Sequence, residues 1–127
     1  MKRVVFAVIL LAGMIYFNFY CFQLVTQSKN SVIMRLEELS AVLDENGANK
    51  KTAAAAAEFT EFWMDEHHLL CRIVRHELLD QMTSSVSQFY PLAVYKDAAE
   101  LSAEISRCRM LMEEIWDSER PILRNIL

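Results

Sequence analysis

Residues 63–80 have the sequence WMDEHHLLCRIVRHELLD, and the arrangement of the chain is decided within them. On a helical wheel at about 100° per residue, the apolar stripe of residues 59–74 lies within roughly 60° of Phe59. The stripe of residues 78–89 lies roughly 100–180° away on the same wheel. Because one straight helix could not keep both stripes on one core, the pattern predicts a break at Arg75-His76.

The composition favours helix throughout the chain. Its 127 residues include only two glycines and two prolines, fewer than long sheets with tight turns need. Alanine, leucine, glutamate and methionine, all strong helix formers, are plentiful. We therefore expect an all-α fold, with one domain and an appendage.

The appendage is an apolar segment near the N-terminus. Val4–Val25 contains no charged residue, and as a helix its 22 residues would span roughly 33 Å, enough to cross a bilayer. Lys2 and Arg3 favour a cytoplasmic N-terminus. We therefore expect a cytoplasmic segment 1–3, a transmembrane anchor 4–25 and an extracytoplasmic domain 26–127 at the cell membrane. The alternative is secretion after cleavage of a signal peptide.

Residues 26–127 are expected to form an antiparallel up-down bundle of about four helices. The first helix should continue directly from the membrane span and end at Gly47, and the second should start near Asn49. The third should run from Glu77 towards Val94 and be kinked or ended by Pro91.

The C-terminal part of the bundle is predicted from its capping residues and one apolar stripe. Asp97 should cap the fourth helix, and Ser118 should open a short last helix ending in Asn125-Ile126-Leu127. The stripe of the fourth helix comprises Leu101, Ile105, Cys108, Leu111, Met112 and Ile115.

The expected outer domain is acidic. Of the 13 basic residues of the chain, 11 follow the span, together with all 17 acidic residues, which gives a net charge of −6. This charge argues against binding to nucleic acid and against electrostatic docking on anionic lipid.

His76, Glu77 and Asp80 are the first candidates for chemistry. His76 and Asp80 would share one helix face and could bind a divalent metal ion. However, Asp80 stands where H-E-x-x-H has its second histidine, and a third ligand is not evident. We therefore interpret these residues as the start of a helix, with Glu77 near the positive end of the helix dipole.

The neighbouring run Asp65-Glu66-His67-His68 offers a second candidate metal cluster. Adjacent histidines point about 100° apart on a helix, and the chain has no matching element of the kind that di-iron bundles require. We expect a solvated polar face here, although Glu66 interrupts an apolar stripe.

The remaining reactive and aromatic residues have structural interpretations. Cys71 and Cys108 would lie at similar heights on two helices, so a disulfide is geometrically feasible, but a free buried thiol is preferred. Trp63 and Trp116 should pack in the core, with each indole N–H meeting a polar partner or water. No Ser/His/Asp frame or glycine-rich phosphate loop is present, so we expect no catalytic residues and no cofactor.

The chain resembles a family of small, single-span, helical bacterial proteins, common in clostridia (Firmicutes), that is known only as a domain of unknown function. The N-terminal anchor, Trp63 and His76-Glu77-x-x-Asp80 carry the resemblance, together with Asp97, Glu104 and Asn125-Ile126-Leu127. In that family an acidic residue commonly precedes the histidine, whereas here the residue is Arg75. The resemblance implies topology and fold and supplies no function.

Three functions are compatible with these features. The first is a non-enzymatic, membrane-anchored scaffold or interaction module of the cell envelope, and we prefer it because no catalytic constellation is complete. The second is a metal- or thiol-dependent site centred on His76 and Asp80. The third is a ligand-sensing accessory subunit of a membrane complex. The expected partners are the lipid bilayer, through residues 4–25, and another membrane or envelope protein, with self-association as a further option.

Overall fold

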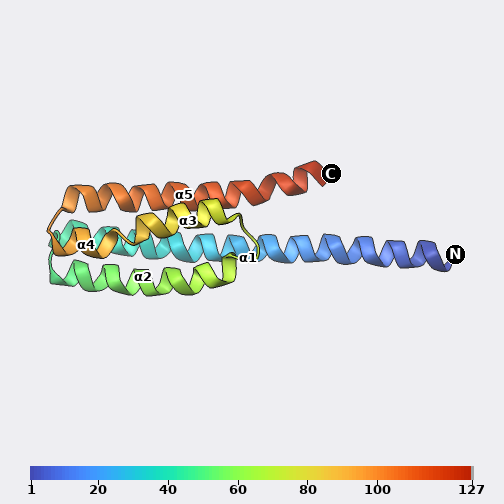
Figure 1. The fold of residues 1–127 in the computed structure, drawn as a ribbon, viewed down its shortest axis with the longest axis horizontal. Coiled ribbons are helices and arrows are strands. Elements are labelled where there is room, and N and C mark those ends of the chain that lie inside the picture. The colour runs from blue at the N-terminus through green and yellow to red at the C-terminus, as the bar shows by residue number, and fades with distance from the viewer. Residues whose placement is uncertain (127) are drawn as a thin grey trace.

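Five helices account for nearly all of residues 1–126 (Figure 1). The computed structural model describes the backbone of residues 1–126 and the side chains of residues 1–118. The helices are α1 (Lys2–Asn46), α2 (Lys50–Leu70), α3 (His76–Val86), α4 (Phe89–Val94) and α5 (Ala98–Ile126). No strand occurs in residues 1–126, so the predicted all-α class is confirmed.

Helix α1 runs for 45 residues, roughly 67 Å at 1.5 Å per residue, and its N-terminal part extends beyond the other helices (Figure 1). The prediction that the apolar segment continues into the first outer helix is confirmed. The helix ends where Gly47 adopts a φ of 66°, and the Gly47 N–H donates to the carbonyl of Leu43 at 2.8 Å. Glycine suits this left-handed conformation because it has no Cβ.

Helix α2 starts beside Asn49, as predicted, and Asn49 is its cap. Its side-chain oxygen accepts hydrogen bonds from the backbone N–H groups of Lys51 and Thr52, at 3.0 and 3.1 Å. The buried hydroxyl of Thr52 donates to the carbonyl of Gly47. The cap therefore fixes the turn between α1 and α2 as well as the start of α2.

The predicted break between the two apolar stripes is confirmed. Helix α2 ends at Leu70 and α3 begins at His76, separated by a turn over residues 71–75. Trp63 on α2 and Leu79 on α3 are both fully buried. The turn thus allows both stripes to face one core.

The helix predicted from Glu77 towards Val94, with a kink or end at Pro91, is divided into α3 and α4. The helix is interrupted at Ser87-Gln88, and Pro91 lies in the first turn of α4. Proline lacks an N–H group, and its ring clashes with the carbonyl four residues earlier, which here belongs to Ser87. The interruption therefore lies one turn before Pro91.

Asp97 caps α5 as predicted, since its Oδ1 accepts from the Glu100 N–H at 3.2 Å. The separate short helix predicted from Ser118 is wrong, because α5 continues without interruption from Ala98 to Ile126. The end of that predicted helix, Leu127, lies outside the described residues. The capping potential of Ser118 is used inside the helix, where its hydroxyl donates to the carbonyl of Ile115 at 2.7 Å.

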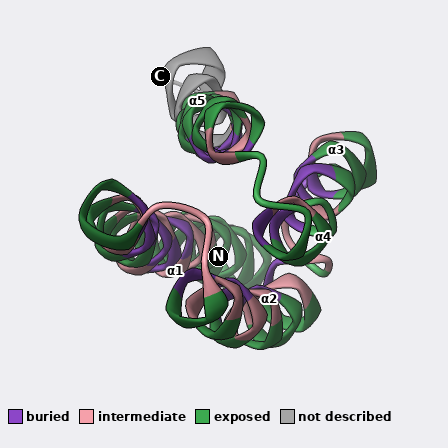
Figure 2. Cartoon of the chain, turned by 90° about the vertical axis from the view of Figure 1, so that its left-hand side faces the viewer, coloured by how far each residue is buried: buried purple, intermediate pink, exposed green. Residues whose placement is uncertain are grey.

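The helices lie side by side around one core. Helix α1 packs against α2 and α5, α3 packs against α5, and α4 contacts both α2 and α5. Figure 2 shows that the buried faces of the helices point towards the centre. The apolar stripe predicted for residues 101–115 is entirely buried, which confirms it. The first buried residue along the chain is Val25.

The end of α4 contains a strained residue. Lys96 has a φ of 60°, and it is the only non-glycine residue with positive φ in the described backbone. The Asp97 N–H donates to the carbonyl of Leu92 at 3.0 Å, and the Lys96 N–H donates to that of Ala93 at 3.3 Å. This pair of bonds is a Schellman motif, which usually has glycine at the position of Lys96.

We predict that Lys96→Gly stabilises the fold. Relief of the left-handed backbone, about 1–2 kcal/mol, should outweigh the added chain entropy of glycine, about 0.5–1 kcal/mol. Reversible urea unfolding followed by circular dichroism should show a higher midpoint. The control Lys51→Gly, in the first turn of α2, should lower the midpoint; an equal decrease in both variants would contradict the strain.

Candidate functional site

The residues predicted as metal candidates lie on the surface. His76, Glu77 and Asp80 are all exposed in the first turns of α3. Helix α3 begins at His76 with Glu77 in its first turn, as expected for a helix start. Within residues 1–118, no group of three or more His, Cys, Asp or Glu side chains is placed to hold a metal ion.

The second candidate cluster is divided between two environments. Asp65 and His68 are exposed, as expected for a solvated face, but Glu66 and His67 are half-buried. The His67 ring meets the Trp63 ring edge-on at 6.2 Å between centroids, and the buried Nδ1 of His67 has no hydrogen-bond partner. The prediction of a solvated face is therefore wrong for half of the cluster.

Two serine–carboxylate pairs connect helices through the interior. The Ser28 hydroxyl of α1 donates to Glu66 of α2, and the Ser85 hydroxyl of α3 donates to Glu104 of α5. Both serines are buried, at 4% and 2% exposure. Hydrogen bonds to a charged acceptor are strong and directional, so these pairs fix the register of the helices. In the sequence, only the position of Glu66 within the apolar stripe of α2 indicated one of these pairs, and nothing indicated the pair of Ser85 with Glu104.

Both tryptophans bind hydroxyl groups, as predicted. The indole N–H of buried Trp63 donates to Thr83 at 3.0 Å, which connects α2 with α3. The indole N–H of half-buried Trp116 donates to Thr26 at 3.0 Å. Lys29 Nζ lies 4.2 Å from the centroid of the Trp116 ring. Trp116 therefore connects α5 with α1 where the apolar N-terminal part of α1 leaves the core.

The cysteines are free thiols, as predicted. Half-buried Cys71 donates from Sγ to the carbonyl of His68 at 3.2 Å. Cys108 lies in the core, and its burial raises its pKa from the usual 9.0 to about 12. Its thiol is therefore neutral at physiological pH and is not a nucleophile.

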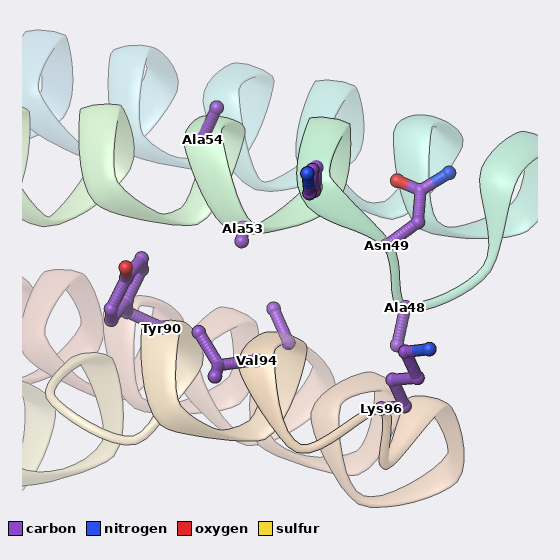
Figure 3. A pocket seen from close by; sticks show the side chains of 9 residues that line it. Ala48, Asn49, Ala53, Ala54, Tyr90, Val94 and Lys96 are labelled. Carbon is purple, nitrogen blue, oxygen red and sulfur yellow. The ribbon is translucent and has the colours of Figure 1, made fainter.

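An open groove lies at the end of the bundle farthest from the N-terminus, between the start of α2 and α4 (Figures 1 and 3). Its volume is about 470 Å³. The lining residues are small, apolar or basic: Ala48, Asn49, Lys50, Ala53, Ala54, Tyr90, Ala93, Val94 and Lys96. The groove was not predicted from the sequence. The run Ala53–Ala57 was an indication of it, because the small side chain of alanine leaves space beside a helix.

The N-terminal part of α1 packs against nothing in the described structure. Every residue from Met1 to Phe17 is exposed, and most of them are large and apolar. By length and composition, α1 is the one described helix that could cross a membrane. A signal sequence near an N-terminus has the same character.

The model of a family described as a domain of unknown function (DUF4363) matches residues 19–126. The match covers most of the chain, which therefore belongs to this family. No curated protein and no solved structure matches the chain.

We predict that Thr83→Val destabilises the fold by about 1–3 kcal/mol, because it leaves the buried indole N–H of Trp63 without an acceptor. Urea unfolding should show the loss. The matched control is Thr60→Val on α2, whose hydroxyl donates only to the carbonyl of Ala56 in its own helix. That variant should change stability by less than about 0.5 kcal/mol, and equal losses would refute the role of the Trp63–Thr83 bond.

We also predict a pH effect of Cys108. Its folded-state pKa is raised from 9.0 to about 12, so its contribution to stability is fully present below pH 9.0 and is lost as the pH rises through about 12. The difference in unfolding free energy between the wild type and Cys108→Ala should therefore shrink from pH 8 to pH 11. In the folded chain iodoacetamide should modify Cys71 and spare Cys108; equal modification of both would contradict the burial.

Proposed function

We propose that this DUF4363 member is a non-enzymatic scaffold or protein-interaction module of the bacterial cell envelope. In this proposal the N-terminal part of α1 is a single transmembrane anchor. Residues 1–3 lie in the cytoplasm, and the helical bundle of residues 26–127 lies outside. The partner is another membrane or envelope protein.

The observation that carries the proposal is the difference between the two parts of α1. Residues 1–17 are exposed and predominantly apolar, whereas residues from Val25 onward place a regular stripe in the core. A contiguous apolar surface of this length is unfavourable in water and favourable in a bilayer. Lys2 and Arg3 supply the charge that favours a cytoplasmic N-terminus.

The junction between the two parts has the residues that membrane interfaces favour. Tyr16 and Tyr20 are exposed on α1, and Trp116 lies beside Phe22 with ring centroids 5.9 Å apart. Amphipathic aromatic rings are enriched at such interfaces. Lys29 follows Phe22 by two turns, and its ammonium group lies over the ring of Trp116.

The continuity of α1 supports a scaffold. Because one helix extends from the apolar segment to Asn46, the far end of the bundle would be held about 30 Å from the membrane surface without a flexible linker. The histidines and carboxylates of residues 1–118 are distributed over separate exposed and half-buried positions. This dispersion favours binding through surfaces over catalysis at a site.

We predict that Leu10→Lys combined with Leu11→Lys releases the protein from membranes, because each lysine costs about 2.5–3.5 kcal/mol at the centre of a span. Alkaline extraction of membranes should leave the wild type in the pellet. Mass spectrometry should show that residues 1–25 are retained, and external protease should digest the bundle in intact protoplasts.

The control is Met34→Lys, which adds a charge to an exposed position of α1 beyond the apolar segment. It should remain in the pellet. A mature protein lacking residues 1–25 would overturn the anchor in favour of secretion, and protection of the bundle from external protease would overturn the topology.

A further inference from the structure

We propose that the groove between the start of α2 and α4 docks an acidic, amphipathic helical segment of a partner protein. This inference specifies the partner chemistry of the scaffold proposed above and rests on that proposal. The start of α2 and α4, whose residues line the groove, lie at the end of the bundle farthest from the apolar part of α1 (Figure 1).

The groove arises from a change in side-chain size along the contact between α2 and α4. Phe59 and Phe89 meet at 5.5 Å between ring centroids and are both buried, so the two helices are tightly packed there. One to two turns nearer the start of α2, the small side chain of Ala53 lies on the side of the helix towards α4 (Figure 3). Ala93 lines the groove from α4. Alanines allow another backbone to approach closely, as in helix-in-groove recognition.

The apolar wall of the groove is exposed to solvent. Tyr90 and Val94, one turn apart on α4, are 51% and 48% exposed. Tyr95, beside the groove, is 82% exposed. Amphipathic aromatic residues of this kind are enriched in protein interfaces, where they supply contact area with little loss of entropy. An occupant with apolar side chains at helical spacing would cover this wall.

The charge of the groove indicates that the polar face of the docked helix is acidic. Lys50 and Lys96 line it, and no carboxylate does. By contrast, the groove between α1 and α2 contains Arg35 with Glu38 and Glu58, and the groove between α1 and α5 contains Arg109 with Glu37 and Asp44. The two lysines are therefore uncompensated within the groove, in a bundle with an overall negative charge. Carboxylates on the partner would complement them.

The strained backbone at Lys96 is an independent observation at the same place. A lysine occupies a left-handed position that glycine would fill at lower free energy, and its side chain is at the mouth of the groove. Unfavourable backbone conformations of this kind persist at functional sites. Retention of a long cation there is explained if the ammonium group contacts the partner.

The experiment uses the full chain in its native membrane with a photo-crosslinker in the groove. Tyr90→p-benzoylphenylalanine is irradiated, and the crosslinked peptide is identified by mass spectrometry. We expect a segment of a membrane or envelope protein with carboxylates on one helical face and apolar residues on the other. Ala103→p-benzoylphenylalanine, on the exposed surface of α5, is the positional control.

Charge variants test the recognition. Lys50→Glu and Lys96→Glu, combined with the crosslinker, should each lower the yield by about tenfold, the effect expected for reversing a charge opposite a partner carboxylate. Lys51→Glu is the matched control, because it makes the same charge change in the same helical turn and does not line the groove. It should change the yield by less than about twofold. Ala53→Leu, which enlarges a side chain on the side of α2 towards α4, should also abolish the adduct.

Four outcomes would overturn the docking site: no adduct above the position-103 control, adducts only with lipid, adducts only with a second copy of the chain, or equal losses for Lys50→Glu and Lys51→Glu. A partner that co-purifies with the anchored protein but never crosslinks at position 90 would leave the scaffold intact and remove the groove. If a chain released from the membrane still formed the adduct, the docking groove would stand and the membrane-anchored scaffold would fail.

Discussion

The rest of the structure depends on the uninterrupted backbone of α1. Its hydrogen-bonded ladder extends from the exposed apolar residues into the core stripe of Val25, Val32, Leu36, Leu39 and Leu43. A break between the two parts would leave the orientation of the bundle free. Instead, the stripe determines where α2 and α5 pack, and Trp116 and Glu66 tie those helices back to Thr26 and Ser28 on α1. The apolar segment and the bundle are therefore joined by one continuous helix, against which α2 and α5 are packed and hydrogen-bonded.

Periodicity and capping predicted the elements correctly where one local interaction decides the outcome. Gly47, Asn49 and Asp97 each determine a helix end through their own backbone or side chain, and all three were identified from sequence. The change in direction of the apolar stripe near residue 75, which predicted the break between α2 and α3, was equally local. The differences arose where two signals compete. Pro91 was expected to kink or end the third helix, and the helix is interrupted one turn before it, at Ser87-Gln88. A serine and a proline near the C-terminus resembled a new helix start, but α5 continues through them.

The candidate sites were harder to predict because their members are distant in sequence. His76, Glu77 and Asp80 drew attention by their spacing, yet all three face solvent. The polar residues that organise the interior are pairs such as Ser28 with Glu66 and Ser85 with Glu104, and no local pattern distinguishes them. A carboxylate within an apolar stripe was the only hint, because such a group must find a donor when it is half-buried. The identity of that donor required the fold.

The groove illustrates a limit of reading chemistry from residue type. Alanine runs and surface lysines are usually unremarkable, and the run Ala53–Ala57 was interpreted only as strong helix. Its consequence appears once α4 is placed opposite: small side chains of α2 line a groove together with Tyr90 and Val94 of α4, and two lysines also line it. After the interruption at Ser87-Gln88, α4 contacts both α2 and α5 at the far end of the bundle. Pro91 does not line the groove itself, but it lies in α4, whose Tyr90 and Val94 form the apolar wall on which the proposed partner would dock.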